Sequence, residues 1–472
     1  MTDPVVPGSL AALQARYGER HRWLLLLSLM IGTMASVMSS TIVNVAIPDM
    51  SQHFALGQDR AHWVSSGFMA AMTLSMLPTS WLLARFGYRH TYVGAVTLLM
   101  LGGIFGGLAR HYELVLAMRV AEGLAAGVLQ VIPSIIVLRA FGDGERGRAM
   151  GIFGFGVVLA PAIGPTVGGV LVEHFGWRSI FFVVVPFALW AMLLARRYLP
   201  VSAPGGAEPG EHSSPLDWVG LALAAVGVIG LLNGLVHLHD AAPWSAAVHL
   251  GVGVTALGLF VWHAARTPTP LFELGLFRSR PFAMGSVVAF VYGMGLFGST
   301  YLLPVFMLVA LKLSASSVGA VLLPAGLALA LTIPVAGKLS DHRPLAQTIV
   351  IGLSVMCASF AAVLAVGEHT AVLWVTLIAV LGRIGLGLVI PSLSLASVRA
   401  LPAPLMPYGT STMNFLRQLG GAIGVSAVGI LLEWRLQAHG AEAGGTLAAF
   451  HEVFVLMALI TGLAALAARR MR

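Results

Sequence analysis

Four charged residues lie deep inside long apolar stretches of the sequence, away from their ends, and they are the residues best placed to do chemistry. They are Arg119, Glu122, Arg383 and Arg417, and Glu122 is the one carboxylate among them. A charge at the centre of a lipid bilayer costs about 2.5 to 3.5 kcal/mol on insertion scales. An acid in such a position is therefore a functional hypothesis by default.

Glu122 and Arg119 are predicted to act together in proton coupling. They are three positions apart, so a helix places both on one face. Burial disfavours an ionised carboxylate and a nearby arginine favours it, so a change of conformation lets the acid take up or release a proton. The alternative is a structural ion pair that fixes one helix to a neighbour. Arg383 is predicted to line a cavity or to fix its helix to a neighbour. Arg417 is predicted to line a cavity, and the alternative is that its side chain extends to the cytoplasmic membrane interface.

The elements that position these charges are predicted to be membrane-spanning helices. Of 472 residues, 58% are hydrophobic and only 10% are charged, which is more apolar than soluble domains are. A helix crosses the hydrocarbon core with about 20 apolar residues. Fourteen such runs are predicted: 23–47, 61–84, 91–109, 113–140, 149–172, 178–198, 216–238, 244–264, 282–310, 316–337, 347–366, 371–398, 409–432 and 450–468.

Other kinds of chemistry lack support in the sequence. There is no phosphate-binding loop and no zinc-type His-Glu-x-x-His motif, and the single cysteine, Cys357, lies in an apolar run. The basic residues form short clusters between apolar runs, which disfavours a nucleic-acid partner. We therefore expect no enzyme activity, no metal and no cofactor. The energy source is then an ion gradient, with protons the expected ion, a solute gradient or a partner protein.

The distribution of Lys and Arg predicts the orientation. With fourteen spans, nineteen of the 27 Lys and Arg residues fall on the side of the two termini, and five fall in loops on the other side. Because basic residues accumulate on the cytoplasmic side, both termini are predicted to be cytoplasmic.

The chain also predicts two similar six-helix halves. Arg119 stands four residues before a Gly-Leu pair, and Arg383 stands four residues before a second Gly-Leu pair. The fourth and twelfth spans therefore share a sequence pattern, which indicates an internal repeat. Such repeats are typical of transporters that alternate around a central site. The expected units are a cytoplasmic segment (1–22), an N-terminal bundle (23–199), a linker (200–215), an inserted helix pair (216–264), a second linker (265–281) and a C-terminal bundle (282–472).

Several motifs resemble the fourteen-helix drug/proton antiporters of the major facilitator superfamily, the EmrB/QacA type. The resemblance covers essentially the whole chain and implies an all-α membrane fold. It rests on Ser39 to Pro48 in the first span, Arg119 in the fourth, Gly164-Pro165 and Gly168-Gly169 in the fifth, Trp177-Arg178 before the sixth, Gly337 to Arg343 in a gating loop, and Asn414 to Gly421 in the thirteenth.

The resemblance implies which residues control the conformation. A carboxylate at Asp341 is expected to pair with helix ends and arginines in one conformation only. The other residues expected to act in gating or bending are Arg343, Arg85, Gly164, Pro165, Gly168 and Gly169.

The sequence departs from the family pattern at the acids. Ser39 replaces the first-span aspartate usually assigned to proton coupling, and Ala84 replaces an aspartate of the first gating loop. Glu122 stands where the family has a glutamine. Either the protonatable site has moved to Glu122, or the protein is not proton-coupled in the usual way.

The expected function is efflux of lipophilic, often cationic compounds in exchange for protons. The alternatives are a dedicated metabolite transporter and a non-transporting receptor or scaffold. Residues expected to line the substrate cavity are Met34, Met38, Ser39, Asn44, Trp63, Phe68, Gln130, Tyr292, Phe297, Tyr301, Arg383, Asn414 and Arg417.

The expected location is the bacterial inner membrane, in which the chain is predicted to be a monomer in the lipid bilayer. The expected partners are a small-molecule substrate and, as candidates, a periplasmic adaptor and an outer-membrane channel.

Overall fold

The protein is a bundle of long helices. The computed structural model describes residues 9–471 except 143, 205–207, 211–213, 237, 239–242, 400 and 441–442. No strand occurs among these described residues. The α-helices are α1 (Leu10–Tyr17), α2 (Arg20–His53), α3 (Gln58–Ser75), α4 (Thr79–Gly107), α5 (Tyr112–Ala140), α6 (Arg146–Phe175), α7 (Ser179–Phe182), α8 (Val184–Tyr198), α9 (Trp218–Val236), α10 (Pro243–Ala264), α11 (Arg280–Val309), α12 (Ala315–His342), α13 (Leu345–Ala362), α14 (Val372–Arg399), α15 (Met406–His439) and α16 (Ala443–Arg469), with short 3-10 helices at Leu274–Arg278, Val363–Ala365 and Ala403–Leu405.

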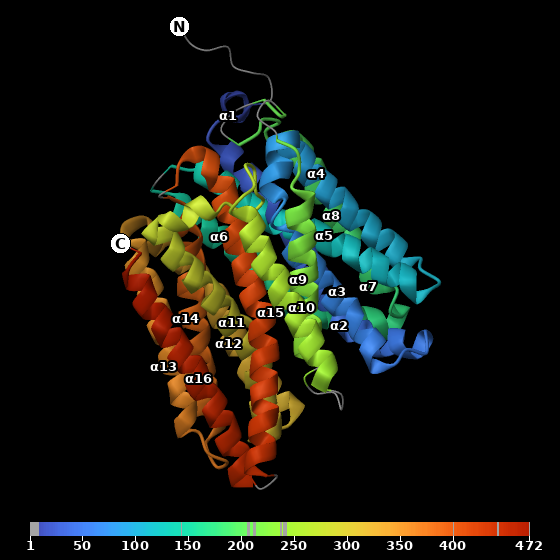
Figure 1. Ribbon diagram of the computed structural model, residues 1–472, viewed down its shortest axis with the longest axis vertical. Helices are drawn as coiled ribbons and strands as arrows, with labels where there is room; N and C mark the ends of the chain where they lie inside the picture. The colour runs from blue at the N-terminus through green and yellow to red at the C-terminus, as the bar shows by residue number, and fades with distance from the viewer. Residues whose placement is uncertain are drawn as a thin grey trace.

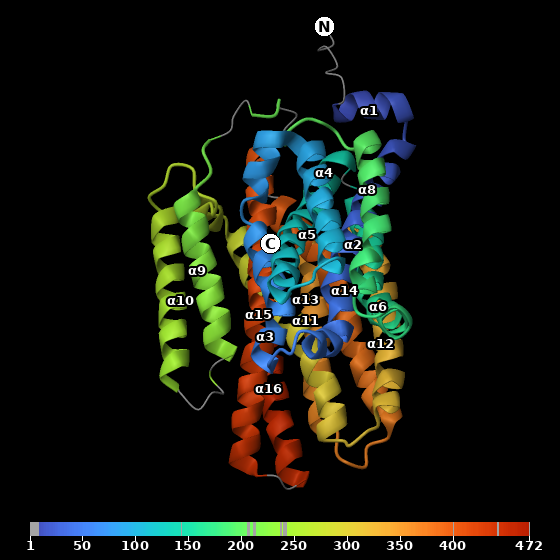
Figure 2. The same cartoon turned by 90° about the vertical axis from the view of Figure 1, so that its right-hand side faces the viewer.

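The helices form two bundles and a separate pair. Helices α2 to α8 pack with one another, and so do α11 to α16. In Figure 1 the N-terminal bundle lies to the upper right and the C-terminal bundle to the lower left. Helices α9 and α10 pack on each other, and Figure 2 shows this pair standing beside the rest of the molecule. Parts of the expected segments 1–22 and 200–215 lie outside the described residues.

Thirteen helices of the described chain are long and apolar enough to cross a membrane, where the sequence predicted fourteen spans. The difference lies at the predicted span 61–84. Helix α3 covers only part of this span and begins with the polar residues Gln58, Asp59 and Arg60. Its average hydropathy is therefore too low for it to count as a membrane-crossing helix by itself. The rest of that span is the start of α4.

A reversal at Gly87 explains why the boundaries differ there. Gly87 has φ 73°, and the Thr91 hydroxyl donates to the Leu82 carbonyl at 3.0 Å. Nine residues of straight helix would span about 13.5 Å, so the chain must fold back between them. Glycine is required because a Cβ at position 87 would lie 2.0 Å from the Val201 carbonyl oxygen. Helix α4 is therefore two antiparallel helical segments.

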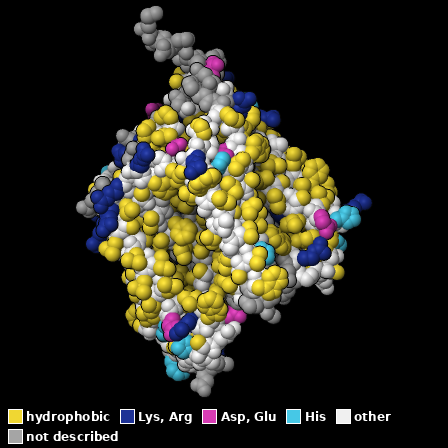
Figure 3. All heavy atoms as spheres, viewed as in Figure 1, with side chains coloured by type: hydrophobic (Ala, Val, Ile, Leu, Met, Phe, Trp, Pro, Cys, Tyr) yellow, Lys and Arg dark blue, Asp and Glu magenta, His cyan; other side chains and the backbone are white. Residues whose placement is uncertain are grey.

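The outer surface is suited to lipid. Large hydrophobic side chains such as Trp190, Leu323 and Leu463 are well exposed. Figure 3 shows that hydrophobic side chains cover most of the visible face, with Lys and Arg mainly toward its edges. Because a soluble surface of this kind would aggregate, the pattern indicates a membrane protein.

The two bundles meet closely where α6 begins and α12 ends. A Cβ on Gly147 would lie 2.2 Å from the Gly337 carbonyl oxygen, and one on Gly151 would lie 3.0 Å from that of Ile333. The far half of α6 packs on α2 instead, since Gly168 faces Ile42. We call the contact of Gly147 and Gly151 with Gly337 the α6–α12 crossing. The two bundles are held together at this end of the molecule.

Candidate functional site

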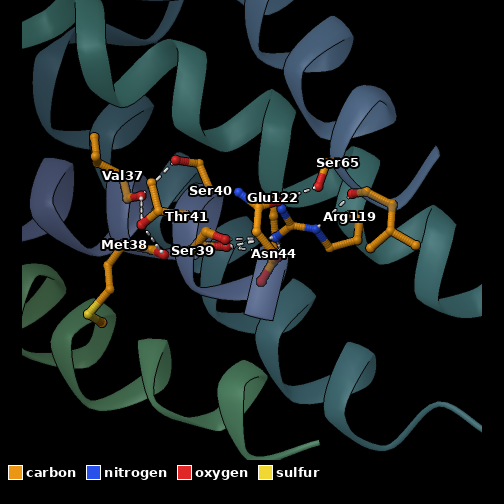
Figure 4. Close-up of polar contacts among 10 residues, drawn as sticks. Val37, Met38, Ser39, Ser40, Thr41, Asn44, Ser65, Arg119 and Glu122 are labelled. Atoms are coloured by element: carbon orange, nitrogen blue, oxygen red, sulfur yellow. Dashed lines mark hydrogen bonds and ion pairs between the residues drawn. The ribbon is translucent and has the colours of Figure 1, made fainter. Parts of the chain in front are cut away.

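Helix α5 carries Arg119 and Glu122 into the interior of the N-terminal bundle. Both side chains are almost inaccessible to solvent, at 1% and 0% exposed. Helix α2 brings Ser39 to the same place, and Ser39 is also buried. Figure 4 shows the three side chains converging from α2 and α5. Ser39, which stands where the family resemblance implies a coupling aspartate, therefore contacts Glu122 directly.

The three side chains form a closed set of hydrogen bonds. Arg119 Nη1 donates to Glu122 Oε2 at 2.6 Å and to Ser39 Oγ at 2.9 Å. The Ser39 hydroxyl in turn donates to Glu122 Oε2 at 3.2 Å. Charge-assisted bonds of this kind are stronger than those between neutral groups, and Ser39 links both ions.

Helix α3 holds the other side of the Arg119 guanidinium. Arg119 Nε donates to the Val64 carbonyl at 3.2 Å, and the guanidinium carbon lies 4.3 Å from the centre of the Phe68 ring. A desolvated cation over an aromatic face gains about 2 kcal/mol or more. Arg119 is thus positioned by α2, α3 and α5 together.

Glu122 has room only because α4 presents glycines to it. A Cβ on Gly102 would lie 2.5 Å from Glu122 Cγ, and one on Gly103 would lie 3.7 Å from Glu122 Oε1. Two buried atoms of the pair, Glu122 Oε1 and Arg119 Nη2, have no hydrogen-bond partner within the described chain. Unsatisfied buried polar atoms are costly and are characteristic of functional sites. The pair therefore retains one acceptor and one donor for water, a proton or another group.

A second polar cluster bridges the two bundles. Arg417 Nη2 on α15 donates to Gln130 Oε1 on α5 at 3.3 Å and to Asn414 Oδ1 at 2.9 Å. Gln130 also approaches Met72 on α3, with Nε2 3.4 Å from Sδ. A group that contacts both bundles is well placed to sense their relative movement.

Tyr292 connects this cluster to Arg383. Its hydroxyl is buried on α11 and donates to the Leu386 carbonyl at 3.2 Å. Both Arg417 and Arg383 lie close enough to interact electrostatically with Tyr292. Arg383 itself donates to Thr300 Oγ1 at 3.2 Å.

Asp341 joins the bundles at the α6–α12 crossing. Its two carboxylate oxygens accept from the backbone N–H groups of Gly147 and Arg148, at 2.6 and 2.8 Å. These donors belong to the first turn of α6, where a helix leaves N–H groups unpaired and favours a negative charge. Asp341 therefore acts as a cap on a helix of the opposite bundle.

The other residues predicted for gating lie apart from Asp341. Arg85 is exposed before the reversal at Gly87, next to Gly210 of the linker, and Arg343 is exposed at the end of α12. Gly164 and Gly168 face Thr41 and Ile42 of α2, whereas no atom lies within 4 Å of a Cβ on Gly169. The side chain of Pro165 lies outside the described residues.

The predicted cavity residues fall into several places rather than one. Phe68 contacts Arg119. The second polar cluster contains Gln130, Asn414 and Arg417, and Tyr292 connects it to Arg383. Asn44 accepts from Ser65 at 2.7 Å further along α2, as Figure 4 shows. Phe297 packs on Gly421, Tyr301 is 40% exposed near Gly429, Met38 is buried beside Gly164, and Met34 and Trp63 are partly buried.

Several contributors were not predicted from the sequence, and three of them show the pattern. Gly102, Ser65 and Thr300 each contact a predicted residue. The Gly102-Gly103 pair inside an apolar run was the one available signal, because it marks a place where a helix can approach a bulky group. The described residues contain no group of three or more His, Cys, Asp or Glu that could hold a metal ion.

Two helical bundles around buried charges are typical of membrane transporters, and the comparisons with known proteins indicate a transporter rather than an enzyme. The family model for the Major Facilitator Superfamily matches residues 29–425, so the chain belongs to this superfamily. A multidrug resistance protein B homolog of Mycobacterium tuberculosis is 30% identical over 92% of this chain and 81% of its own length. The lincomycin resistance protein LmrB of Listeria monocytogenes is 27% identical over 88% and 87%.

The fold is also that of a solved transporter. The human organic anion transporter MFSD10 (TETRAN) matches 95% of this chain and 99% of its own, with a TM-score of 0.66 and 15% identity. At this identity the likeness concerns the fold alone.

Proposed function

We propose that this transporter exports lipophilic small molecules, such as drugs or toxic compounds, in exchange for protons. The observation that carries the proposal is the fully buried Glu122, paired with Arg119 and Ser39 where α2, α4 and α5 meet. Its ionisation depends on the contacts of both neighbours, so a movement of α2 against α5 changes its affinity for a proton. The names of the relatives in Mycobacterium and Listeria support drug export.

Alternating access would couple Glu122 to the substrate. The α6–α12 crossing closes one end of the molecule in this structure, and Asp341 caps α6 there. Opening that end must break both oxygen contacts of Asp341 and separate the glycine backbones. Packed interfaces of this kind switch between two arrangements rather than deform continuously.

We place the chain in the fourteen-helix branch of the superfamily, in the inner membrane, with both termini cytoplasmic. In this topology α3 and the first turns of α4 together make the second crossing, and Gly87 reverses the chain at the cytoplasmic surface. The α6–α12 crossing is then the cytoplasmic end, so the cytoplasmic side is the closed one in this structure.

Reporter fusions test this topology. Fusions after Arg148 and Lys338 are expected to report the cytoplasm, and fusions after Asp59 and Glu368 the periplasm, because the basic residues of the chain lie on the first side. A periplasmic signal at Lys338 contradicts the topology. A cytoplasmic signal at Glu368 would do so independently.

A transport screen tests the function. In a host that lacks its own pumps, the protein is expected to lower the accumulation of several lipophilic compounds, and a proton uncoupler is expected to abolish the effect. Export that persists with the uncoupler favours the dedicated, proton-independent transporter. No change in accumulation for any compound favours a receptor or scaffold.

A further inference from the structure

Two arginines of the C-terminal bundle lack a counterion. Within the described chain, no carboxylate forms an ion pair with Arg417 or Arg383. Arg119 in the N-terminal bundle, by contrast, is neutralised by Glu122. The positive charge of the molecule's interior is therefore concentrated on the C-terminal side.

The internal repeat makes the contrast sharper. Arg383 occupies on α14 the place that Arg119 occupies on α5, and Leu386 stands three residues later, where the N-terminal half has Glu122. Leu386 has no charge to offer Arg383; its carbonyl accepts from Tyr292. The C-terminal half thus kept the cation of the motif but has an apolar residue in place of the acid.

Arg417 borders a small cavity shared by both bundles. Its volume is about 30 Å³, and the residues that line it include Ser134 on α5, Ser394 on α14 and Thr410 on α15. Apolar side chains such as Leu393 and Met413 complete it. A space of this size holds a small polar head group, whereas drug-sized ligands need pockets of roughly 300 Å³ or more. The body of a substrate must therefore lie outside it.

We propose that Arg417 binds an oxyanionic group of the substrate, such as a carboxylate or a phosphonate, with Arg383 adding to the positive field beyond Tyr292. This proposal rests on the proposed export function and narrows it to lipophilic compounds that carry an acidic group. The Gln130 and Asn414 side-chain oxygens hold the guanidinium across the interface between the bundles. Because both of these bonds come from Nη2, the N–H groups of Nε and Nη1 remain to donate single charge-assisted hydrogen bonds to an oxyanion.

Physical reasons favour an anion over the cation that the family resemblance suggested. Arg417 is partly buried, and a charge that is partly removed from water is costly until it is paired, so an arginine whose partners are neutral amides gains from a charged ligand. A cationic substrate in the same cavity would face two like charges without an acid nearby. The buried acid Glu122 of the other bundle is already engaged by Arg119.

The test uses one aromatic body with four head groups. Purified protein is titrated with naphthalene compounds that carry an acetate, a methylphosphonate, an acetamide or a trimethylammonium group, and binding is followed by tryptophan fluorescence. The acetate and the phosphonate are expected to bind at least about tenfold more tightly than the amide, the gain typical of a charge-assisted hydrogen bond. A preference for only one of the two identifies which oxyanion the site takes.

Variants assign the preference to Arg417. Arg417→Gln is expected to remove the difference in binding affinity between the acetate and the acetamide compounds, and Arg417→Lys is expected to retain part of it. Arg110→Gln removes an exposed arginine and the same net charge, so it is expected to leave this difference unchanged. Equal binding of acetate and amide, tighter binding of the ammonium compound, or no binding of any probe overturns the proposal.

Transport separates this inference from the function on which it rests. Proteoliposomes that accumulate the amide or ammonium compound but show no preference for acids support export and overturn the oxyanion site. Arg417-dependent binding of the acetate without any uphill transport supports the site and overturns proton-driven export.

Discussion

Glu122→Gln is expected to abolish uphill transport while leaving substrate binding measurable. The substitution keeps the shape of the side chain but removes its titration, and the other charges deep inside the spans, Arg119, Arg383 and Arg417, are arginines, which do not lose their protons. With an imposed gradient of about one pH unit, exchange of one proton per substrate sustains roughly tenfold accumulation, since about 1.4 kcal/mol corresponds to tenfold. In proteoliposomes the variant's accumulation ratio should fall to one, with downhill exchange preserved.

Controls separate coupling from folding. Breaking a buried ion pair costs about 3 to 5 kcal/mol, so Glu122→Gln is also expected to lower thermal stability. Glu122→Asp keeps a titratable group and should retain some uphill transport. Glu113→Gln, on the same helix but exposed and paired with Arg60, should change neither property greatly. Full accumulation by Glu122→Gln removes Glu122 from the coupling role and favours the proton-independent transporter.

Gly337→Val is expected to prevent closure of the α6–α12 crossing. A Cβ at position 337 would lie 2.3 Å from the Gly147 carbonyl oxygen and 2.7 Å from Gly151 Cα, so the two backbones must separate. Overpacking of this kind costs about 1 to 3 kcal/mol, which shifts a two-state equilibrium roughly five- to 150-fold away from the closed arrangement. Transport should slow by a similar factor, and spin labels at positions 144 and 342, in a Cys357→Ser background, should report a longer distance.

A matched substitution on the same helix controls for the added side chain. No atom lies within 4 Å of a Cβ on Gly326 of α12, so Gly326→Val should leave both the distance and the rate near those of the unchanged protein. An unchanged distance in Gly337→Val would mean that the crossing is not what closes this end.

Asp341→Asn is a milder substitution at the same crossing, because an amide retains one acceptor oxygen for the two N–H groups that donate to the carboxylate. It should slow transport with little change in substrate affinity.

The sequence by itself determined the class of structure and the residues of interest. Hydropathy and helix length depend on local composition, which is why most of the predicted spans appear as helices that are long and apolar enough to cross a membrane. The contact between Arg119 and Glu122 was predictable too, because three residues along a helix bring two side chains to one face whatever surrounds it.

Only the tertiary structure decided which distant groups meet these charges. Ser39 lies 80 residues from Arg119, Gln130 lies 287 residues from Arg417, and Asp341 lies 194 residues from Gly147. Such contacts depend on how each helix is rotated within its bundle, and nearly uniform apolar helices carry little periodicity to fix that rotation. The length and hydropathy of the apolar runs did not predict the reversal at Gly87, for a related reason. It depends on backbone contacts with the linker at Pro200 and Ser202, which no local pattern encodes.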